Sequence, residues 1–121
     1  MRLFLTSEDD TATCVSCEGE ISQLELPANV QNPLEQLLSE AGFARTVVMD
    51  LGPARFIDSS GIDWLLVSHK RFGENGGKLI LHSVPPMIDQ VLRLLQLDSL
   101  FTIKSDRAAA LASAAGAKGT S

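Results

Sequence analysis

The chain has 121 residues, of which 45% are hydrophobic and 21% are charged, and its formal net charge is -5. This length and apolar content suit one domain with one core, and so low a charged fraction of mixed sign excludes a disordered chain. An acidic domain repels a phosphate backbone, so we expect no nucleic-acid partner. No apolar run is long enough to cross a bilayer, and Met1–Thr6 is too short for a signal-peptide core. We therefore expect a cytoplasmic protein without membrane insertion.

The N-terminal region is predicted to form a β-hairpin. Arg2–Thr6 and Thr11–Cys17 have strand-like composition and are separated by the polar turn Ser7–Asp10. Glu18–Glu20, with its central glycine, is predicted to break the second strand, and Ile21–Leu26 is predicted to be a short extended stretch.

The only two cysteines, Cys14 and Cys17, form a CxxC pattern that invites a metal or redox interpretation. The pair lies in the β-rich hairpin segment, where residues three apart point to opposite faces of a strand. Neither a disulfide nor a shared metal fits that geometry, and there is no second CxxC. We expect free thiols, no metal and no cofactor.

The middle of the chain begins with a clear helix signal. Asn32 is a cap candidate, Pro33 suits the first helical position, and Gly42 is predicted to end the helix. The continuous apolar run Thr46–Met49 predicts a strand buried on both faces, and Phe56–Ile57 is a short apolar approach to the next helix.

Two further helices flank a strand. The first is predicted from near Ser60 to Glu74, and the strand is Lys78–His82. Pro85 and Pro86 are predicted to open the next helix. The residues predicted to face inward on these helices are Ile62, Leu65, Leu66 and His69, followed by Ile88, Val91, Leu92 and Leu95.

The chain is predicted to end with a short strand, Phe101–Ile103, and an alanine-rich helix from Arg107 to about Ala115, capped by Ser105–Asp106. The domain is expected to span 1–115, and 116–121 to be a disordered tail. Strands that alternate with helices pair in parallel, and the hairpin adds an antiparallel pair. We predict an α/β fold with a mixed sheet of four to five strands.

The stretch FIDSSGIDWLL places two adjacent serines between strand and helix. A hydrolase elbow has the pattern GxSxG, and here the leading glycine is missing. His69 and His82 are the only histidines, and neither is well placed to activate Ser59. Gly76–Lys78 lacks the spacing of a phosphate-binding P-loop and follows a helix instead of preceding one.

A structural role for the motif is helix capping, which suits Asp58, Ser59 and Ser60 alike. One cap needs one residue, however, and Gly61 within the first turn would leave the hydroxyls open. A phosphate on Ser59 would be favoured by the free N–H groups and the dipole of the helix, and would add about -1.5 to -2 charge. The pattern indicates a switch at a binding surface.

Residues Val47–Ile103 resemble the STAS domain of bacterial anti-sigma factor antagonists. The resemblance is carried by DSSG at the strand-to-helix turn, by GGKL at the restart of the next strand, and by LLQLDSLF near the end. The N-terminal third matches mainly in pattern, around EGEI. The resemblance therefore covers most of the chain, and its second half most strongly.

The resemblance implies a sheet with helices packed largely on one side. It also implies binding to an anti-sigma factor that is a serine kinase, with release of a sigma factor. The kinase would inactivate the antagonist by phosphorylating Ser59, and a metal-dependent serine phosphatase would reverse this. Asp58, Ser60 and Gly61 would form the loop around the phosphorylation site.

Two departures from the family pattern affect the predicted partner surface. Many antagonists carry an acid where this chain has Ser22, and small residues where it has Asp63, Trp64 and Val67. Trp64, Val67 and Arg71 share a helical stripe, and Trp64 is either a half-buried packing residue or a partner anchor. These five residues are the candidate partner contacts.

Two other functions remain open at this stage. The chain could be a STAS subunit of a lipid-transport or stress-signalling complex, which docks on a protein without being phosphorylated. It could instead be a small hydrolase or nucleotide-binding enzyme, which would need a catalytic base that the sequence does not supply. We therefore expect a protein that is not an enzyme.

Overall fold

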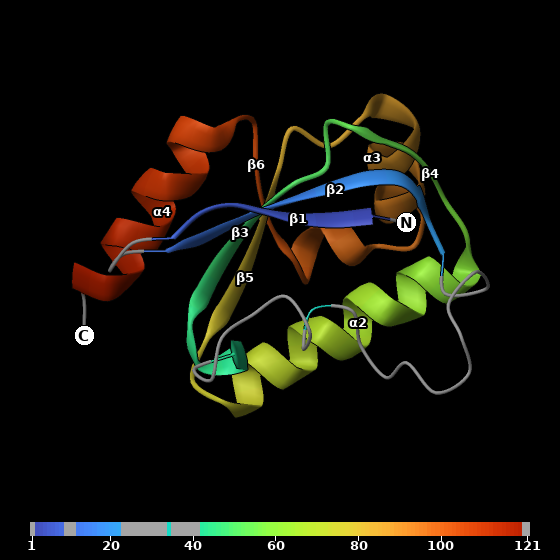
Figure 1. Cartoon of the computed structure of the whole chain (residues 1–121). Helices are drawn as coiled ribbons and strands as arrows, with labels where there is room; N and C mark the ends of the chain where they lie inside the picture. The colour runs from blue at the N-terminus through green and yellow to red at the C-terminus, as the bar shows by residue number, and fades with distance from the viewer. Residues whose placement is uncertain (1, 9–11, 23–33, 35–41, 120–121) are drawn as a thin grey trace.

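The computed structural model describes residues 2–8, 12–22, 34 and 42–119 (Figure 1). Six strands form one mixed sheet in the order β1-β2-β3-β5-β6, and β4 pairs with β2 off this path. The strands are β1 Arg2–Glu8, β2 Thr13–Ile21, β3 Thr46–Asp50, β4 Ala54–Ile57, β5 Lys78–His82 and β6 Thr102–Lys104.

The pairing confirms the mixed α/β fold. β1 is antiparallel to β2, and β2, β3, β5 and β6 are parallel to one another. β3 lies at the centre, between β2 and β5, and Val47, Val48 and Met49 on it are fully buried. The uninterrupted apolar run therefore marks a strand covered on both faces, as predicted.

The sheet has six strands where four to five were predicted, and β4 is the additional one. It pairs with the far part of β2, from within the predicted break of that strand onward. β2 continues through the predicted break to Ile21, with Gly19 at a φ of +85° and a shift in pairing register beside it. A glycine tolerates this backbone, so the strand bends without ending. Its far part pairs in parallel with β4, of which the sequence indicated only the short apolar approach Phe56–Ile57.

Helices cover the two faces of the sheet unequally (Figure 1). The helical elements are η1 Gly42–Ala44, α2 Ser59–Glu74, α3 Pro86–Leu94, η2 Leu97–Ser99 and α4 Arg107–Gly119. α2 and α3 contribute to the large core cluster with Val15, Val47 and Met49, whereas α4 contributes Ala110 and Ala114 to a smaller cluster on the other face. The prediction of helices largely on one side is thus confirmed, and α4 is the exception.

Two helix ends differ from prediction, and one predicted helix lies mostly outside the described residues. Leu95 was expected to face inward but is 52% exposed, because α3 ends at Leu94 and Gln96 turns the chain with a φ of +60°. α4 continues to Gly119, beyond the predicted end at Ala115. The helix predicted from Pro33 lies outside the described residues except for Leu34, which is helical and buried.

The two cysteines lie on opposite faces of β2, as expected. Cys17 packs in the cluster beneath α2 and α3, and Cys14 packs in the cluster beneath α4. Both are free thiols, and burial raises the pKa of Cys17 to about 12. The CxxC pattern therefore does not bring the two thiols together, because they lie on opposite faces of the strand.

In the parts of the chain that the structure describes, no helix combines the length and the apolar character needed to cross a membrane.

Candidate functional site

The serine pair lies at the junction of β4 and α2, and Asp58 organises it. Asp58 has extended backbone angles and is the N-cap of α2, with its backbone N–H donating to the carbonyl of Ile21 at 3.3 Å. Its carboxylate accepts from the N–H of Gly61 at 2.8 Å and from the hydroxyl of Ser60 at 2.7 Å. Of the three residues that suit capping, Asp58 is the N-cap, and Ser60 is held by the cap instead of serving as one.

Ser22, at the end of β2, supports this cap from below. Its hydroxyl lies 3.3 Å from that of Ser60, and the side chain is only 4% exposed. Hydrogen bonds from Ser22 and then Ser60 lower the pKa of Asp58, so the carboxylate is ionised at neutral pH. The prediction of Ser22 as a direct partner contact is wrong, because the start of α2 covers it. It acts instead on Asp58 and Ser60.

Ser59 differs from its neighbours. It is the first residue of α2 and is exposed. Its hydroxyl makes no hydrogen bond to another residue that the structure describes, whereas Asp58, Ser60 and Ser22 are bonded to one another. Of the two adjacent serines, one is engaged within the loop and the other faces outward.

Gly61 is required for a reason that the sequence did not indicate. The position that a Cβ would occupy collides with the carbonyl oxygen of Ile21 and lies 2.6 Å from its carbonyl carbon. The predicted role of keeping the hydroxyls open is therefore wrong, because Gly61 is buried against backbone. The missing side chain lets α2 begin directly on the end of β2, which brings Ser22 and Ser60 together.

The rest of the predicted stripe on α2 divides into core and surface. Trp64 is 1% exposed and belongs to the main core cluster, which favours the packing residue over the partner anchor among its two predicted roles. The inward face of α2 is therefore rotated relative to the predicted one, and it contains Gly61, Trp64, Leu65, Ser68 and Phe72.

The other predicted contact residues on α2 lie at the surface. Asp63 is exposed, and Val67 is 45% exposed. Arg71 places its guanidinium 4.2 Å from the ring centroid of Phe43.

Phe56 is an exposed aromatic residue near the site that sequence reasoning missed. It was expected to anchor the approach to the serines together with Ile57, and only Ile57 is buried. Among the described strands β4 pairs with β2 alone, and Arg55 and Phe56 on it are exposed. An apolar pair alone does not reveal which member faces outward.

The arrangement does not support hydrolysis at Ser59. His69 stacks edge-on against Phe101, with ring centroids 5.3 Å apart, and His82 lies on the face of the sheet that α4 covers. Neither imidazole forms a hydrogen bond with Ser59 in the described structure. Among the described residues no group of three or more metal-ligating side chains occurs either.

The STAS domain family model matches residues 5–110, and the chain therefore belongs to this family. An anti-sigma-factor antagonist (STAS) domain protein from Planctomyces limnophilus is 26% identical, with a TM-score of 0.65 over 93% of this chain and 97% of that one. An anti-sigma factor antagonist from Mycobacterium paratuberculosis is 22% identical, with a TM-score of 0.70 over 93% and 94%. The anti-sigma factor antagonist SpoIIAA in its unphosphorylated form is 17% identical, with a TM-score of 0.58 over 88% and 90%. The fold is thus that of anti-sigma factor antagonists.

Asp58→Ala is expected to destabilise the protein by about 1 kcal/mol, because the N–H of Gly61 and the hydroxyl of Ser60 lose their acceptor. Urea unfolding followed by circular dichroism measures this loss. Asp58→Asn keeps an acceptor and is expected to lose less. Equal losses in the two variants would show that charge, and not the hydrogen bonds, makes the cap effective.

Proposed function

We propose that this protein is an anti-sigma factor antagonist that binds an anti-sigma factor with serine-kinase activity. Phosphorylation of Ser59 by that kinase switches the antagonist off, and a metal-dependent serine phosphatase restores it. The observation that carries the proposal is the contrast at the start of α2: Ser59 is exposed, whereas Ser60 is held by Asp58. The protein acts as a binding module and not as an enzyme.

The electrostatics of the loop explain how a phosphate would act. Asp58 is ionised and already occupies the N–H of Gly61. A phosphate on Ser59 adds about -1.5 to -2 charge beside this carboxylate. In a complex, that charge would be desolvated without a partner built to receive it, which weakens binding.

The proposed contact surface combines the loop with the exposed part of α2. Asp63 and Val67 lie one and two turns beyond Ser59 and face solvent, and Phe56 adds an exposed aromatic side chain on β4. Arg71 extends the surface toward the end of the helix, where it lies over Phe43. Trp64 and Ser22 support this surface from within.

The test is phosphorylation by candidate serine kinases encoded near this protein's gene, read by intact mass. We expect one phosphate on the native protein and on Ser60→Ala, and none on Ser59→Ala. Ser59→Glu is expected to weaken kinase binding by about 100-fold, as a buried unpaired charge does. Ser60→Ala is the matched control because it keeps Ser59 and removes the adjacent hydroxyl.

Three outcomes would contradict the proposal. The proposal requires phosphate on the Ser60→Ala variant and none on the Ser59→Ala variant. The reverse pattern would show that Ser60, and not Ser59, is the phosphorylated residue. Absence of both modification and binding with every candidate would remove the antagonist function. Partner binding that tolerates Ser59→Glu and occurs without phosphorylation would instead support a docking subunit of a transport or signalling complex.

A further inference from the structure

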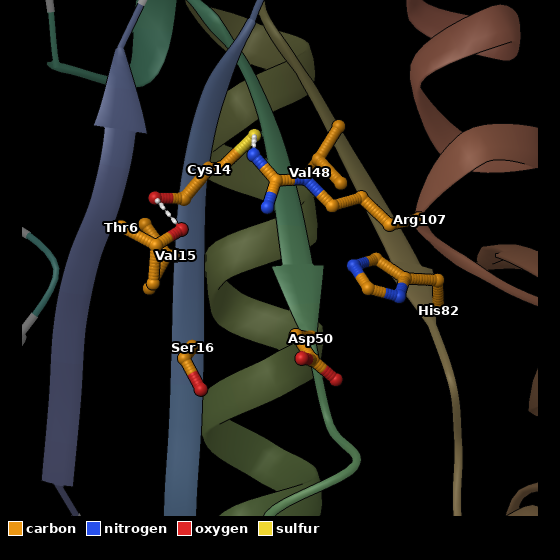
Figure 2. Close-up of a pocket in the computed structure, with 8 residues that line it drawn as sticks. All are labelled: Thr6, Cys14, Val15, Ser16, Val48, Asp50, His82 and Arg107. Atoms are coloured by element: carbon orange, nitrogen blue, oxygen red, sulfur yellow. Dashed lines mark hydrogen bonds between the residues drawn. The ribbon is translucent and has the colours of Figure 1, made fainter.

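A second polar site lies on the face of the sheet that α4 covers, away from Ser59 (Figure 2). It is a pocket of about 90 Å³. Ser16, Asp50 and His82 form its base, because Ser16 pairs with Asp50 across β2 and β3, and Asp50 pairs with His82 across β3 and β5. Asp50 and His82 are the last residues of their parallel strands, an edge where α/β proteins commonly bind ligands.

Arg107, the first residue of α4, supplies a positive charge above this row. Its guanidinium donates to the hydroxyl of Ser7 at 3.1 Å and lies 3.8 Å from the sulfur of Cys14. Figure 2 shows the side chain reaching from α4 across β3 toward Cys14. One side of the pocket is therefore cationic, and this side is held in place by contacts to β1 and β2.

Asp50 supplies the opposite charge. One carboxylate oxygen accepts from the N–H of Gly52 at 2.8 Å, which orients the group. No ion pair joins Asp50 to Arg107 in the structure as described, although both line the pocket. Two opposite charges thus face one small space without neutralising each other.

His82 lies between them and is almost fully enclosed, at 3% exposed. Its Nδ1 lies 2.9 Å from the hydroxyl of Ser83, and no hydrogen bond of Nε2 to a described residue is present. In Figure 2 one ring nitrogen points into the space between Asp50 and Arg107. Burial lowers the pKa of His82, so the imidazole is neutral at neutral pH and adds a hydrogen-bonding group without a third charge.

We propose that this pocket binds a small zwitterion of the size of the simplest free amino acids, with its carboxylate at Arg107 and His82 and its ammonium at Asp50 and Ser16. A simple anion would face the carboxylate of Asp50, and a simple cation would face the guanidinium of Arg107. A ligand that carries both charges can pair with Arg107 and with Asp50 at the same time. A pocket of about 90 Å³ suits a ligand of this small size.

The test uses the full-length chain and proton NMR of its two histidines, His69 and His82. His69 packs against Phe101 in the layer of α2 and serves as an internal control, and a His69→Gln variant assigns the two imidazole signals. Glycine and β-alanine are the probes. We expect a saturable shift of the His82 signal, with half-saturation on the order of 1 mM, and no shift of His69. Acetate and methylammonium at equal ionic strength should each bind about tenfold more weakly.

Variants then assign the two charges. Arg107→Gln and Asp50→Asn should each weaken glycine binding about tenfold, and Asn keeps an acceptor for the N–H of Gly52. Arg93→Gln is the control, because Arg93 pairs with Asp89 on α3 and does not line this pocket. Circular dichroism confirms folding of each variant.

The proposal is overturned if no probe shifts the His82 signal, or if acetate binds as tightly as glycine. The comparison of glycine with acetate uses the native chain, so it decides the question even if a variant fails to fold. Kinase binding and phosphorylation of Ser59 are measured separately. Failure of one proposal therefore leaves the other standing.

Discussion

Gly61→Ala is expected to destabilise the protein by about 3 kcal/mol or more, and to disrupt the loop that presents Ser59. The added Cβ would collide with the backbone carbonyl of Ile21 and would also lie 3.0 Å from a methyl carbon of its side chain. Backbone at the end of β2 cannot move aside, because its carbonyl also accepts from the N–H of Asp58. Denaturant unfolding gives the change in the free energy of unfolding.

Gly73→Ala is the matched control in the same helix. Nothing lies within 4 Å of the Cβ that it would add. Because alanine is the better helix former, this variant should be more stable by about 0.5 to 1 kcal/mol. Equal behaviour of the two alanine variants would contradict the close approach of α2 to β2.

Trp64→Ala is expected to cost about 3 to 5 kcal/mol, the loss typical of a large aromatic side chain removed from a core. Trp64 is among the largest fully buried side chains and packs in the main cluster between α2 and the sheet. Since it is the only tryptophan, unfolding is followed by circular dichroism. Trp64→Phe should recover part of the loss.

Val67→Ala provides the comparison on the exposed side of α2 and should change stability by about 0.5 kcal/mol or less. The pair separates core from contact surface. If Trp64→Ala left stability unchanged and abolished partner binding, Trp64 would be the anchor that the sequence pattern suggested. We expect the reverse: lost stability for Trp64→Ala, and for Val67→Ala a weaker complex with the partner.

The hydrogen bonds at the start of α2 explain why Asp58, Ser59 and Ser60 are not interchangeable. Asp58 accepts hydrogen bonds, Ser60 and Ser22 are bonded to it, and Ser59 projects outward. A phosphate on Ser59 would therefore be placed beside an ionised group whose position is fixed. Ser59 is thus the serine of this pair with an exposed side chain, while Ser60 is bonded to Asp58, in keeping with the proposed switch.

Local signals predicted much of the architecture. The apolar run at β3 and the start of α2 beside the serine pair are read correctly, because burial on both faces and helix capping depend on a few adjacent residues. The opposite placement of Cys14 and Cys17 follows likewise from the two-residue period of a strand. The order of these elements also predicted parallel pairing.

The errors share a different origin. β4 and the bend at Gly19 exist because two distant segments pair, and neither has a strong signal alone. Trp64 was left between packing residue and partner anchor, because helical periodicity defines a stripe but not its rotation against the sheet. The pocket beneath α4 combines residues from β2, β3, β5 and α4, whose proximity depends on strand register.

The sequence by itself determined the alternation of strands and helices and the position of the DSSG motif between a strand and a helix, because each depends on neighbouring residues. Only the tertiary structure decided that Gly61 must lack a side chain, that Ser22 lies beneath the cap, and that Asp50, His82 and Arg107 share a pocket. Those relations join residues far apart in the chain. They are decided by how closely strands and helices approach, which no local pattern records.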